Sequence, residues 1–260
     1  MKIGVCTISG RPAPVEDVLQ GIATTVASGV EIWGREHIEP GTPERCEEIR
    51  QLAEELQLDI PVYGSYVRPG TAQCRDIGER EIRIARDLNA SMIRVWAGEQ
   101  EHQDVTEAHW NAVVEDLEWL AERATDAGIE ITVERHAGTV TNTMEGAREL
   151  MTETPACVGL NYQPSFDDDV DTVARDIETL APLANNVHIQ AKAATDASSR
   201  CPLAFAYFDV ADLLSTLAHA GFDGYVEVEF VTDRCPYRAA VATDVAFLEV
   251  LLEEIASEHQ

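Results

Sequence analysis

The feature that most constrains this chain is a repeat, in which a short apolar run is followed by a segment with helical periodicity about every 30 residues. The apolar runs are IGVCTI, VEIWG, IPVYGSY, MIRVWAG, IEITVE, VGLNY, NVHIQ and YVEVEF. Each run is typical of a buried strand, and eight strands that alternate with helices can close into a parallel barrel. We therefore predict an α/β fold, a single (β/α)8 barrel that forms one domain over residues 1–260.

The segments between the runs carry the expected signals of helix ends. Threonines that precede amphipathic stretches predict helix starts, and glycines that precede the next apolar run predict helix ends, at Thr42, Thr106, Gly128 and Gly221. Two connections are longer than the others, residues 97–105 and 191–208, and both follow the carboxyl end of a strand. Long connections in a compact fold are typical of lids or binding loops.

The charge of the chain is strongly negative. There are 47 Asp and Glu against 19 Lys and Arg, for a net charge of −28, and the only lysines are Lys2 and Lys192. The apolar content is that of a folded protein, so disorder is the poorer explanation. An acidic coat of this kind suits a cytoplasm of molar salt, where charges are screened over about 3 Å. We therefore expect a protein from a halophile.

The composition also excludes several classes of partner. No basic stripe is visible, which argues against nucleic acid. The six cysteines lack CxxC or CxxxH spacing, so neither a zinc cage nor a disulfide framework is indicated. No apolar run approaches the roughly 20 residues of a membrane span, and the first residues are typical of a strand, not of a signal peptide. We expect a soluble, cytoplasmic protein without a membrane partner.

Strand alternation predicts which side chains face the interior of the barrel. In IEITVE, apolar residues alternate with Glu130, Thr132 and Glu134, so carboxylates share the inner face. The same parity in the other strands sends inward a mostly polar set: Glu31, Trp33, Arg94, Trp96, Asn161, Gln163, His188, Gln190, Glu227 and Glu229. We interpret Glu31, Glu130 and Glu227, which lie deeper, as internal polar packing with Arg94 as a partner.

Four of the inward residues lie late in consecutive strands, at the barrel end where catalytic groups collect: Glu134, Gln163, His188 and Glu229. Two carboxylates, an amide oxygen and an imidazole that converge are costly to desolvate, and a divalent cation offsets that cost. A lone inward histidine is more often a hydrogen-bonded core residue, but its three partners favour a ligand role for His188. The mixed oxygen and nitrogen set suits Mn²⁺, Mg²⁺ or Co²⁺ better than structural zinc.

Further residues are candidates for binding a substrate. Trp33 and Trp96, at strand ends, are interpreted either as barrel filling or as walls for the apolar faces of a sugar. His136, Arg68 and Arg200 follow strands and could contact hydroxyls or a phosphate. The alternative for these three is a solvated or ion-paired surface role.

With these motifs, the whole chain resembles the sugar phosphate isomerase/epimerase superfamily, the xylose-isomerase-like TIM barrels. Members of that superfamily hold one metal ion on a Glu ending strand five, an Asp ending strand six, a His ending strand seven and a Glu ending strand eight. By that pattern VERH supplies Glu134, NVHIQ supplies His188 and YVEVEF supplies Glu229. GLNYQPS has Gln163 at the position of the Asp. Because an amide ligates without contributing charge, we expect a lower metal affinity.

The resemblance implies a metal-dependent isomerase or epimerase of a small sugar, sugar phosphate or sugar derivative. In that mechanism a divalent cation acidifies the C–H beside a carbonyl, and Glu134 and Glu229 exchange protons with an enediolate. Two alternatives remain open: an inosose-dehydratase-like lyase, and a carbohydrate-binding barrel that lost its catalyst, which Gln163 would explain. A phosphodiesterase like endonuclease IV fits least, because it needs a metal cluster and a basic surface. The resemblance also implies a homo-oligomer.

Overall fold

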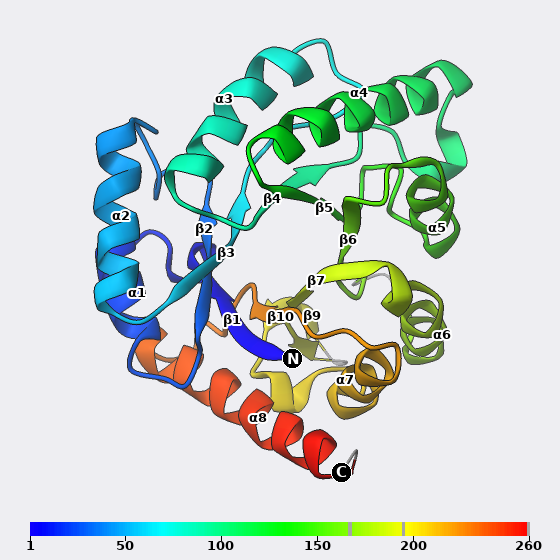
Figure 1. Cartoon of the computed structure of the whole chain (residues 1–260). Helices are drawn as coiled ribbons and strands as arrows, with labels where there is room; N and C mark the ends of the chain where they lie inside the picture. Colours follow the sequence, from blue (N-terminus) through cyan, green and yellow to red (C-terminus); the bar gives the residue numbers. More distant parts are fainter. Residues whose placement is uncertain (166–167, 194–195, 259–260) are drawn as a thin grey trace.

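Eight parallel strands form a closed barrel in a computed structural model of the chain, which describes residues 1–165, 168–193 and 196–258 (Figure 1). The strand order around the barrel is β1-β10-β7-β6-β5-β4-β3-β2. The bounds are β1 (Lys2–Cys6), β2 (Gly29–Trp33), β3 (Asp59–Gly64), β4 (Met92–Trp96), β5 (Glu130–Glu134), β6 (Val158–Tyr162), β7 (Ala184–Ile189) and β10 (Tyr225–Val228). The predicted (β/α)8 architecture is confirmed.

A helix follows each barrel strand and packs outside it, as Figure 1 shows. The helices are α1 (Val15–Ile22), α2 (Pro43–Glu55), α3 (Cys74–Asp87), α4 (Glu107–Asp126), α5 (Met144–Glu153), α6 (Val170–Leu180), α7 (Val210–His219) and α8 (Tyr237–Glu258). Helix α8 packs against α1, so the last helix closes the ring beside the first.

The predicted helix boundaries are confirmed. The side chain of Thr42 accepts a hydrogen bond from the N–H of Arg45 at 3.3 Å and caps α2. Thr106 caps α4 in the same way. Gly128 follows α4 with a φ of +74°, and Gly221 follows α7 with a φ of +83°. Residues with a Cβ rarely adopt this left-handed conformation, so glycine permits the turn into the next strand.

The two long connections contain short elements that the sequence did not reveal. Residues 97–105 include the 3₁₀ helix η2 (His102–Asp104). Residues 191–208 include an antiparallel pair, β8 (Lys192–Ala193) and β9 (Asp196–Arg200), and the 3₁₀ helix η4 (Leu203–Phe205). The pair was missed because its sequence is small and polar and lacks the apolar alternation from which the barrel strands were predicted.

The barrel interior is polar, and its outer wall is apolar. On β10, Val226 and Val228 are fully buried among the apolar residues beneath the helices, whereas Glu227 between them hydrogen-bonds to Asn186 of β7 inside the barrel. The prediction of an internal position for Glu130 is wrong, because this residue is exposed. It is the first residue of β5, where the barrel opens to solvent.

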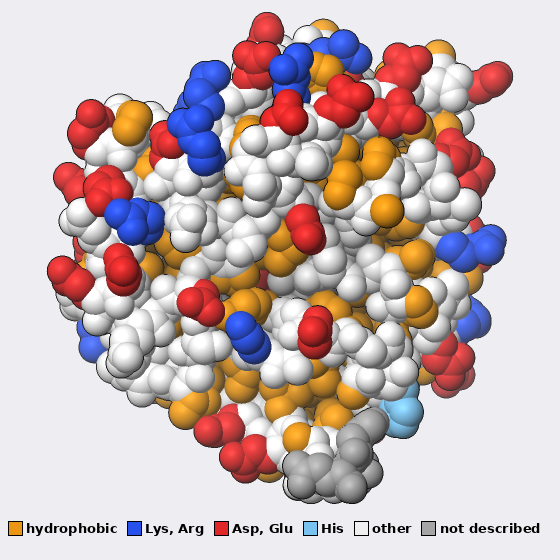
Figure 2. All heavy atoms as spheres, in the orientation of Figure 1, with side chains coloured by type: hydrophobic (Ala, Val, Ile, Leu, Met, Phe, Trp, Pro, Cys, Tyr) orange, Lys and Arg blue, Asp and Glu red, His pale blue; other side chains and the backbone are white. Residues whose placement is uncertain are grey.

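The outer surface carries the acidic excess. Acidic side chains are most numerous along the margin of the face seen in Figure 2, and several more lie toward its centre. Within the described residues, no helix is long and apolar enough to cross a membrane.

Candidate metal and active site

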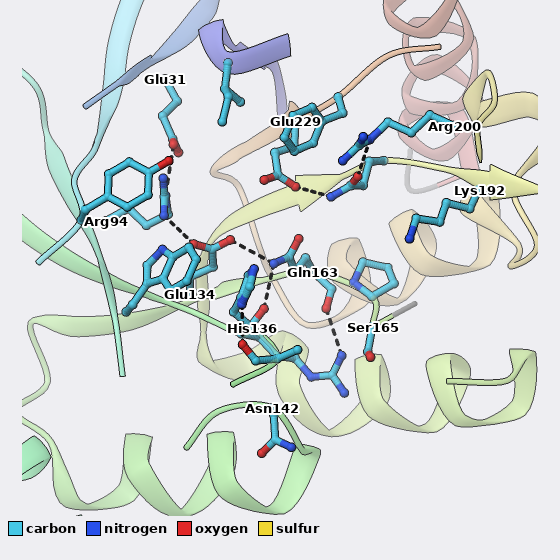
Figure 3. A pocket seen from close by; sticks show the side chains of 18 residues that line it. Glu31, Arg94, Glu134, His136, Asn142, Gln163, Ser165, Lys192, Arg200 and Glu229 are labelled. Carbon is cyan, nitrogen blue, oxygen red and sulfur yellow. Dashed lines mark hydrogen bonds and ion pairs between the residues drawn. The ribbon is translucent and has the colours of Figure 1, made fainter. Parts of the chain in front are cut away.

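The four predicted metal-site residues meet at the carboxyl-terminal end of the barrel. Glu134 ends β5, Gln163 and Glu229 directly follow β6 and β10, and His188 lies within β7. Glu134, Gln163 and Glu229 line a cavity of about 500 Å³, shown in Figure 3. His188 is almost fully buried and lies behind the two glutamates. Parallel strands that end at one rim therefore place residues far apart in sequence at one point.

His188 presents one ring nitrogen to the two glutamates. Its Nδ1 atom is 3.9 Å from Oε1 of Glu134 and 4.0 Å from Oε1 of Glu229. This buried nitrogen has no hydrogen-bond partner among the described residues. An ion with ligand bonds of about 2.1 Å fits between atoms at these separations. Glu134, His188 and Glu229 therefore form a donor set that suits a divalent cation.

Gln163 reaches the same cluster through its amide nitrogen. Nε2 donates to Oε1 of Glu134 at 3.0 Å and to the backbone carbonyl of Arg135 at 2.9 Å. The carbonyl of Arg135 can only accept, so it fixes the NH₂ group on this side of the amide. In this conformation Gln163 donates hydrogen bonds to a candidate metal ligand, and its oxygen ligates a cation only after the amide rotates.

Arg94 of β4 bridges the deep and upper parts of the interior. Its Nε atom donates to Oε1 of Glu31 at 3.1 Å, and Nη1 donates to Oε2 of Glu134. The predicted pairing of Arg94 with Glu31 is confirmed, and its second bond, to Glu134, was missed. Although burial lowers the pKa of Arg94, the charges of Glu134 and Glu31 outweigh burial and raise it. Arg94 therefore remains charged and fixes the orientation of Glu134.

Glu229 is held from the opposite side of the cavity. Oε2 of Glu229 accepts a hydrogen bond from Nε2 of Gln190, and Oε1 of Gln190 accepts one from Nε of Arg200 at 3.0 Å. Burial raises the pKa of Glu229, while the charge of His188 opposes this increase. A carboxylate with a raised pKa exchanges protons more readily near neutral pH.

A second cluster lies deeper in the barrel, on the other side of the imidazole. Nε2 of His188 is 2.8 Å from Oε2 of Glu31, 3.5 Å from Sγ of Cys6 and 3.9 Å from Oε2 of Glu227. These four residues could also hold a metal ion by distance alone. However, Glu31 already pairs with both His188 and Arg94, and a cation would have to displace these positive partners. We interpret the deep cluster as structural.

The residues predicted to bind substrate divide into two groups. Trp96, His136 and Arg200 line the cavity. His136 stacks on Trp96 with ring centroids 4.2 Å apart, and its Nδ1 donates to the carbonyl of Ala137, which leaves Nε2 as an acceptor. A base or hydrogen-bond acceptor thus stands next to Glu134 in the cavity.

Trp33 and Arg68 do not belong to the cavity wall. The indole N–H of Trp33 donates to the hydroxyl of Tyr66 at 2.8 Å, and Tyr66 itself lines the cavity. The guanidinium of Arg68 lies 4.2 Å from the ring of Trp96 and donates to the carbonyl of Gly98. Both residues therefore support cavity residues from behind.

Sequence reasoning missed Arg135. This buried residue directly follows Glu134 and donates to the backbone carbonyl of Gln163 at 3.0 Å. It also pairs with Asp168 at 3.1 Å and with Asp176 at 2.5 Å. Strand parity points it away from the interior, and only its position directly after a strand-ending glutamate could have indicated a role. Arg135 joins the end of β5 to the segment after β6.

These features define a class of protein, a parallel (β/α)8 barrel with a carboxylate and histidine cluster at the mouth. The sequence matches the family described as xylose isomerase-like TIM barrel over residues 22–251, and the chain belongs to that family. No match was found among curated proteins.

Solved structures agree with this assignment. A "probable 3-DHS dehydratase AsbF" from Bacillus anthracis has a TM-score of 0.80 and 16% identity, covering 96% of this chain and 99% of that one. L-ribulose 3-epimerase has a TM-score of 0.79 and 17% identity, and the match covers 100% of this chain and 97% of that one. A xylose isomerase-like TIM barrel protein from Mycobacterium smegmatis, in complex with magnesium, has a TM-score of 0.71 and 15% identity. The match covers 98% of this chain and 97% of that one. At these identities the similarity establishes the fold alone.

Proposed function

We propose that this protein is a metal-dependent isomerase or epimerase of a small sugar, sugar phosphate or sugar derivative. The observation that carries the proposal is the unpartnered Nδ1 of His188 between the carboxylates of Glu134 and Glu229. The family membership and the epimerase folds among the structural neighbours support it.

In the proposed mechanism Glu134, His188 and Glu229 hold one divalent ion, Mn²⁺, Mg²⁺ or Co²⁺, with Gln163 as a fourth ligand once its amide rotates. When bound there, the ion would supply positive charge that makes the C–H beside the substrate carbonyl more acidic and offsets the charge of the enediolate.

Glu229 is our candidate for the base that removes this proton. One of its oxygens accepts from Gln190, whereas both oxygens of Glu134 accept hydrogen bonds, from Arg94 and Gln163. A proton then returns in one of two ways. Glu229 delivers it to the adjacent carbon, which gives isomerisation, or Glu134, after it takes up a proton from solvent, delivers one to the opposite face, which gives epimerisation.

A lyase is the second candidate, because His136 lines the cavity two residues from Glu134. An imidazole there that first takes up a proton at Nε2 can pass it to a departing β-hydroxyl of the same enediolate, which leaves as water and gives dehydration. Trp96, stacked on His136, would face the substrate in both reactions.

The test is proton exchange in D₂O. The protein is incubated with Mn²⁺, Mg²⁺ or Co²⁺ and a panel of free and phosphorylated ketoses, and deuterium incorporation beside the carbonyl is followed by NMR. We expect metal-stimulated exchange that Glu134→Gln abolishes. An increase in enone absorbance identifies the lyase. Sugar binding without metal dependence or turnover would refute both enzymes and leave a carbohydrate-binding barrel.

We further propose that the acidic surface reflects a cytoplasm of high salt. With a net charge of −28, self-repulsion decreases as salt shortens the screening length to about 3 Å at 1 M. The melting temperature should therefore rise between 0.1 and roughly 2 M KCl.

A further inference from the structure

Two cations on neighbouring strands form one side of the cavity. β8 and β9 run antiparallel, and Lys192 lies directly opposite Arg200 in their register. Both residues line the cavity, and Figure 3 shows them entering it from the side opposite Glu31 and Arg94. Like charges directly opposite each other destabilise an antiparallel pair. An anion that lies against both side chains would offset this repulsion.

The composition of the chain makes this pairing unusual. Lys and Arg number only 19 against 47 Asp and Glu, and Lys192 is one of two lysines. The other, Lys2, lies at the opposite end of the barrel, 4.0 Å from Asp59. In a chain that is so poor in cations, a lysine beside an arginine at the mouth of the cavity points to a role in the site.

The side chain of Arg200 is held in a defined orientation. Its Nε atom donates to Gln190 at 3.0 Å, and its guanidinium carbon lies 3.8 Å from the centre of the Phe230 ring. Burial lowers the pKa of Arg200. The negative charge of Glu229 opposes this decrease, and the positive charge of Arg11 adds to it. With Nε bound and one face stacked, the two terminal amino groups are arranged to bind a carboxylate or phosphate in bidentate fashion.

The other arginines that line the cavity differ from Arg200 in their partners. Arg94 pairs with Glu31 and Glu134, and Arg135 pairs with Asp168 and Asp176. No ion pair within the described part of the chain involves Arg200. A bound anion stabilises a half-buried guanidinium that has no carboxylate partner more than it stabilises an exposed guanidinium.

We propose that Lys192 and Arg200 form a subsite for the anionic group, a carboxylate or a phosphate, of a small substrate. Gln190 connects Arg200 to Glu229, so the anion lies close to the carbons that react. The inference rests on the proposed function, because it defines the substrate class of the same site as an acidic sugar derivative. An extended polyanion is excluded by the net charge of −28.

The test is direct binding of inorganic phosphate, and separately of acetate, to the chelator-treated full chain at constant ionic strength by calorimetry. Chelation ensures that phosphate does not report on a metal ion. Arg200→Gln and Lys192→Gln should each weaken phosphate binding by about tenfold or more, because each removes charge-assisted hydrogen bonds. Arg200→Lys should recover part of the loss. Arg175→Gln, an exposed position on α6, is the matched control and should change nothing.

The outcomes separate this inference from the proposed function, since phosphate binding requires neither metal nor turnover. Binding that depends on Arg200 in a protein without exchange activity would support the subsite and refute the enzyme. Exchange on neutral sugars, together with phosphate binding that is absent or unchanged in Arg200→Gln, would support the enzyme and overturn the subsite. Comparison of acetate with phosphate identifies which anion fits.

Discussion

The two ring nitrogens of His188 face two clusters that are similar in composition but differ in their hydrogen-bond partners. Nε2 is 2.8 Å from Glu31, which also pairs with Arg94, in a fully buried cluster. Nδ1 faces Glu134 and Glu229 at 3.9 and 4.0 Å without a hydrogen-bond partner among the described residues, and both glutamates line the cavity. In the deep cluster Glu31 is already bound by both His188 and Arg94, whereas the upper cluster has an unpartnered ring nitrogen.

This difference shows that residue type alone does not separate structural from functional carboxylates. Both clusters contain two glutamates and share one imidazole. What differs is whether the metal-binding atoms are already bound by positively charged side chains. A buried nitrogen without a partner costs free energy that a bound cation can recover, and only the upper cluster presents that nitrogen next to a cavity.

The largest expected effect separates Glu229 from Glu227, which point into the same interior from positions two residues apart. Glu229→Gln should lower the proton-exchange rate by about 10³-fold, because it removes both the proposed base and a charged metal ligand. Glu227→Gln should stay within about tenfold of the parent, since Glu227 is fully buried below the site. NMR exchange rates, with melting temperatures to verify folding, measure both. Equal losses in the two variants would contradict the division into clusters.

The second expected effect is on stability, within the deep cluster. Burial raises the pKa of Glu31, but the charges of Arg94 and His188 outweigh it and lower this pKa to about 2. Burial and the charge of Glu31 raise the pKa of Glu227 to about 8. Glu31 is therefore ionised at pH 7, whereas Glu227 is protonated and resembles glutamine.

Glu31→Gln should thus lower the free energy of unfolding by about 3 kcal/mol, because Arg94 and His188 lose a buried counter-charge. Glu227→Gln should change it by less than about 1 kcal/mol, since a neutral group replaces a neutral group. Urea denaturation at pH 7 gives both values. A greater loss for Glu227→Gln than for Glu31→Gln would reverse our assignment of the charges.

Most of the fold and part of the site could be predicted from the sequence. Strand parity placed Glu134, His188 and Glu229 on one face, because a two-residue period is a local property of each strand. Parity also gave the pair of Arg94 with Glu31, since both point into the same narrow interior. These predictions needed only the direction of each side chain and the closure of the barrel.

The remaining features depend on atoms whose placement the sequence does not determine. The amide of Gln163 donates to Glu134 because the carbonyl of Arg135 lies beside it, and that carbonyl belongs to another strand. The opposition of Lys192 and Arg200 depends on the register of a short polar pair of strands without apolar alternation. Sequence patterns predict which face of a strand or helix a side chain occupies. They do not predict the contacts between loops.

A third effect concerns the upper cluster and its uncharged member. Gln163→Glu should raise Mn²⁺ affinity by about tenfold, because it adds a carboxylate next to Glu134 and removes the donor that competes for its oxygen. Gln163→Met removes the amide oxygen, the proposed fourth ligand, without adding charge and should lower Mn²⁺ affinity by about tenfold. Calorimetric titration with Mn²⁺ measures both. An unchanged affinity in Gln163→Met would mean that the amide oxygen is not a ligand in the loaded protein.

The smallest effect comes from a buried carboxylate outside the barrel, which lacks the partners found in either cluster. Among the described residues, Asp244 of α8 accepts one hydrogen bond, from the N–H of Leu203 at 2.8 Å. Burial raises its pKa to about 6, although this hydrogen bond opposes the increase. The folded state thus binds the proton more tightly than the unfolded state, so this group's contribution to stability falls as pH rises from about 4 through 6.

Asp244→Asn keeps the acceptor for Leu203 and cannot ionise, so it should remove this decrease. At pH 7 the variant should be more stable than the parent by on the order of 1 kcal/mol, and the difference should vanish near pH 4. Urea denaturation at both pH values measures it, with Glu253→Gln, an exposed position on the same helix, as the control. A variant that is less stable than the parent at pH 7 would mean that Asp244 has a charged partner and belongs with Glu31, not with the unpaired carboxylates.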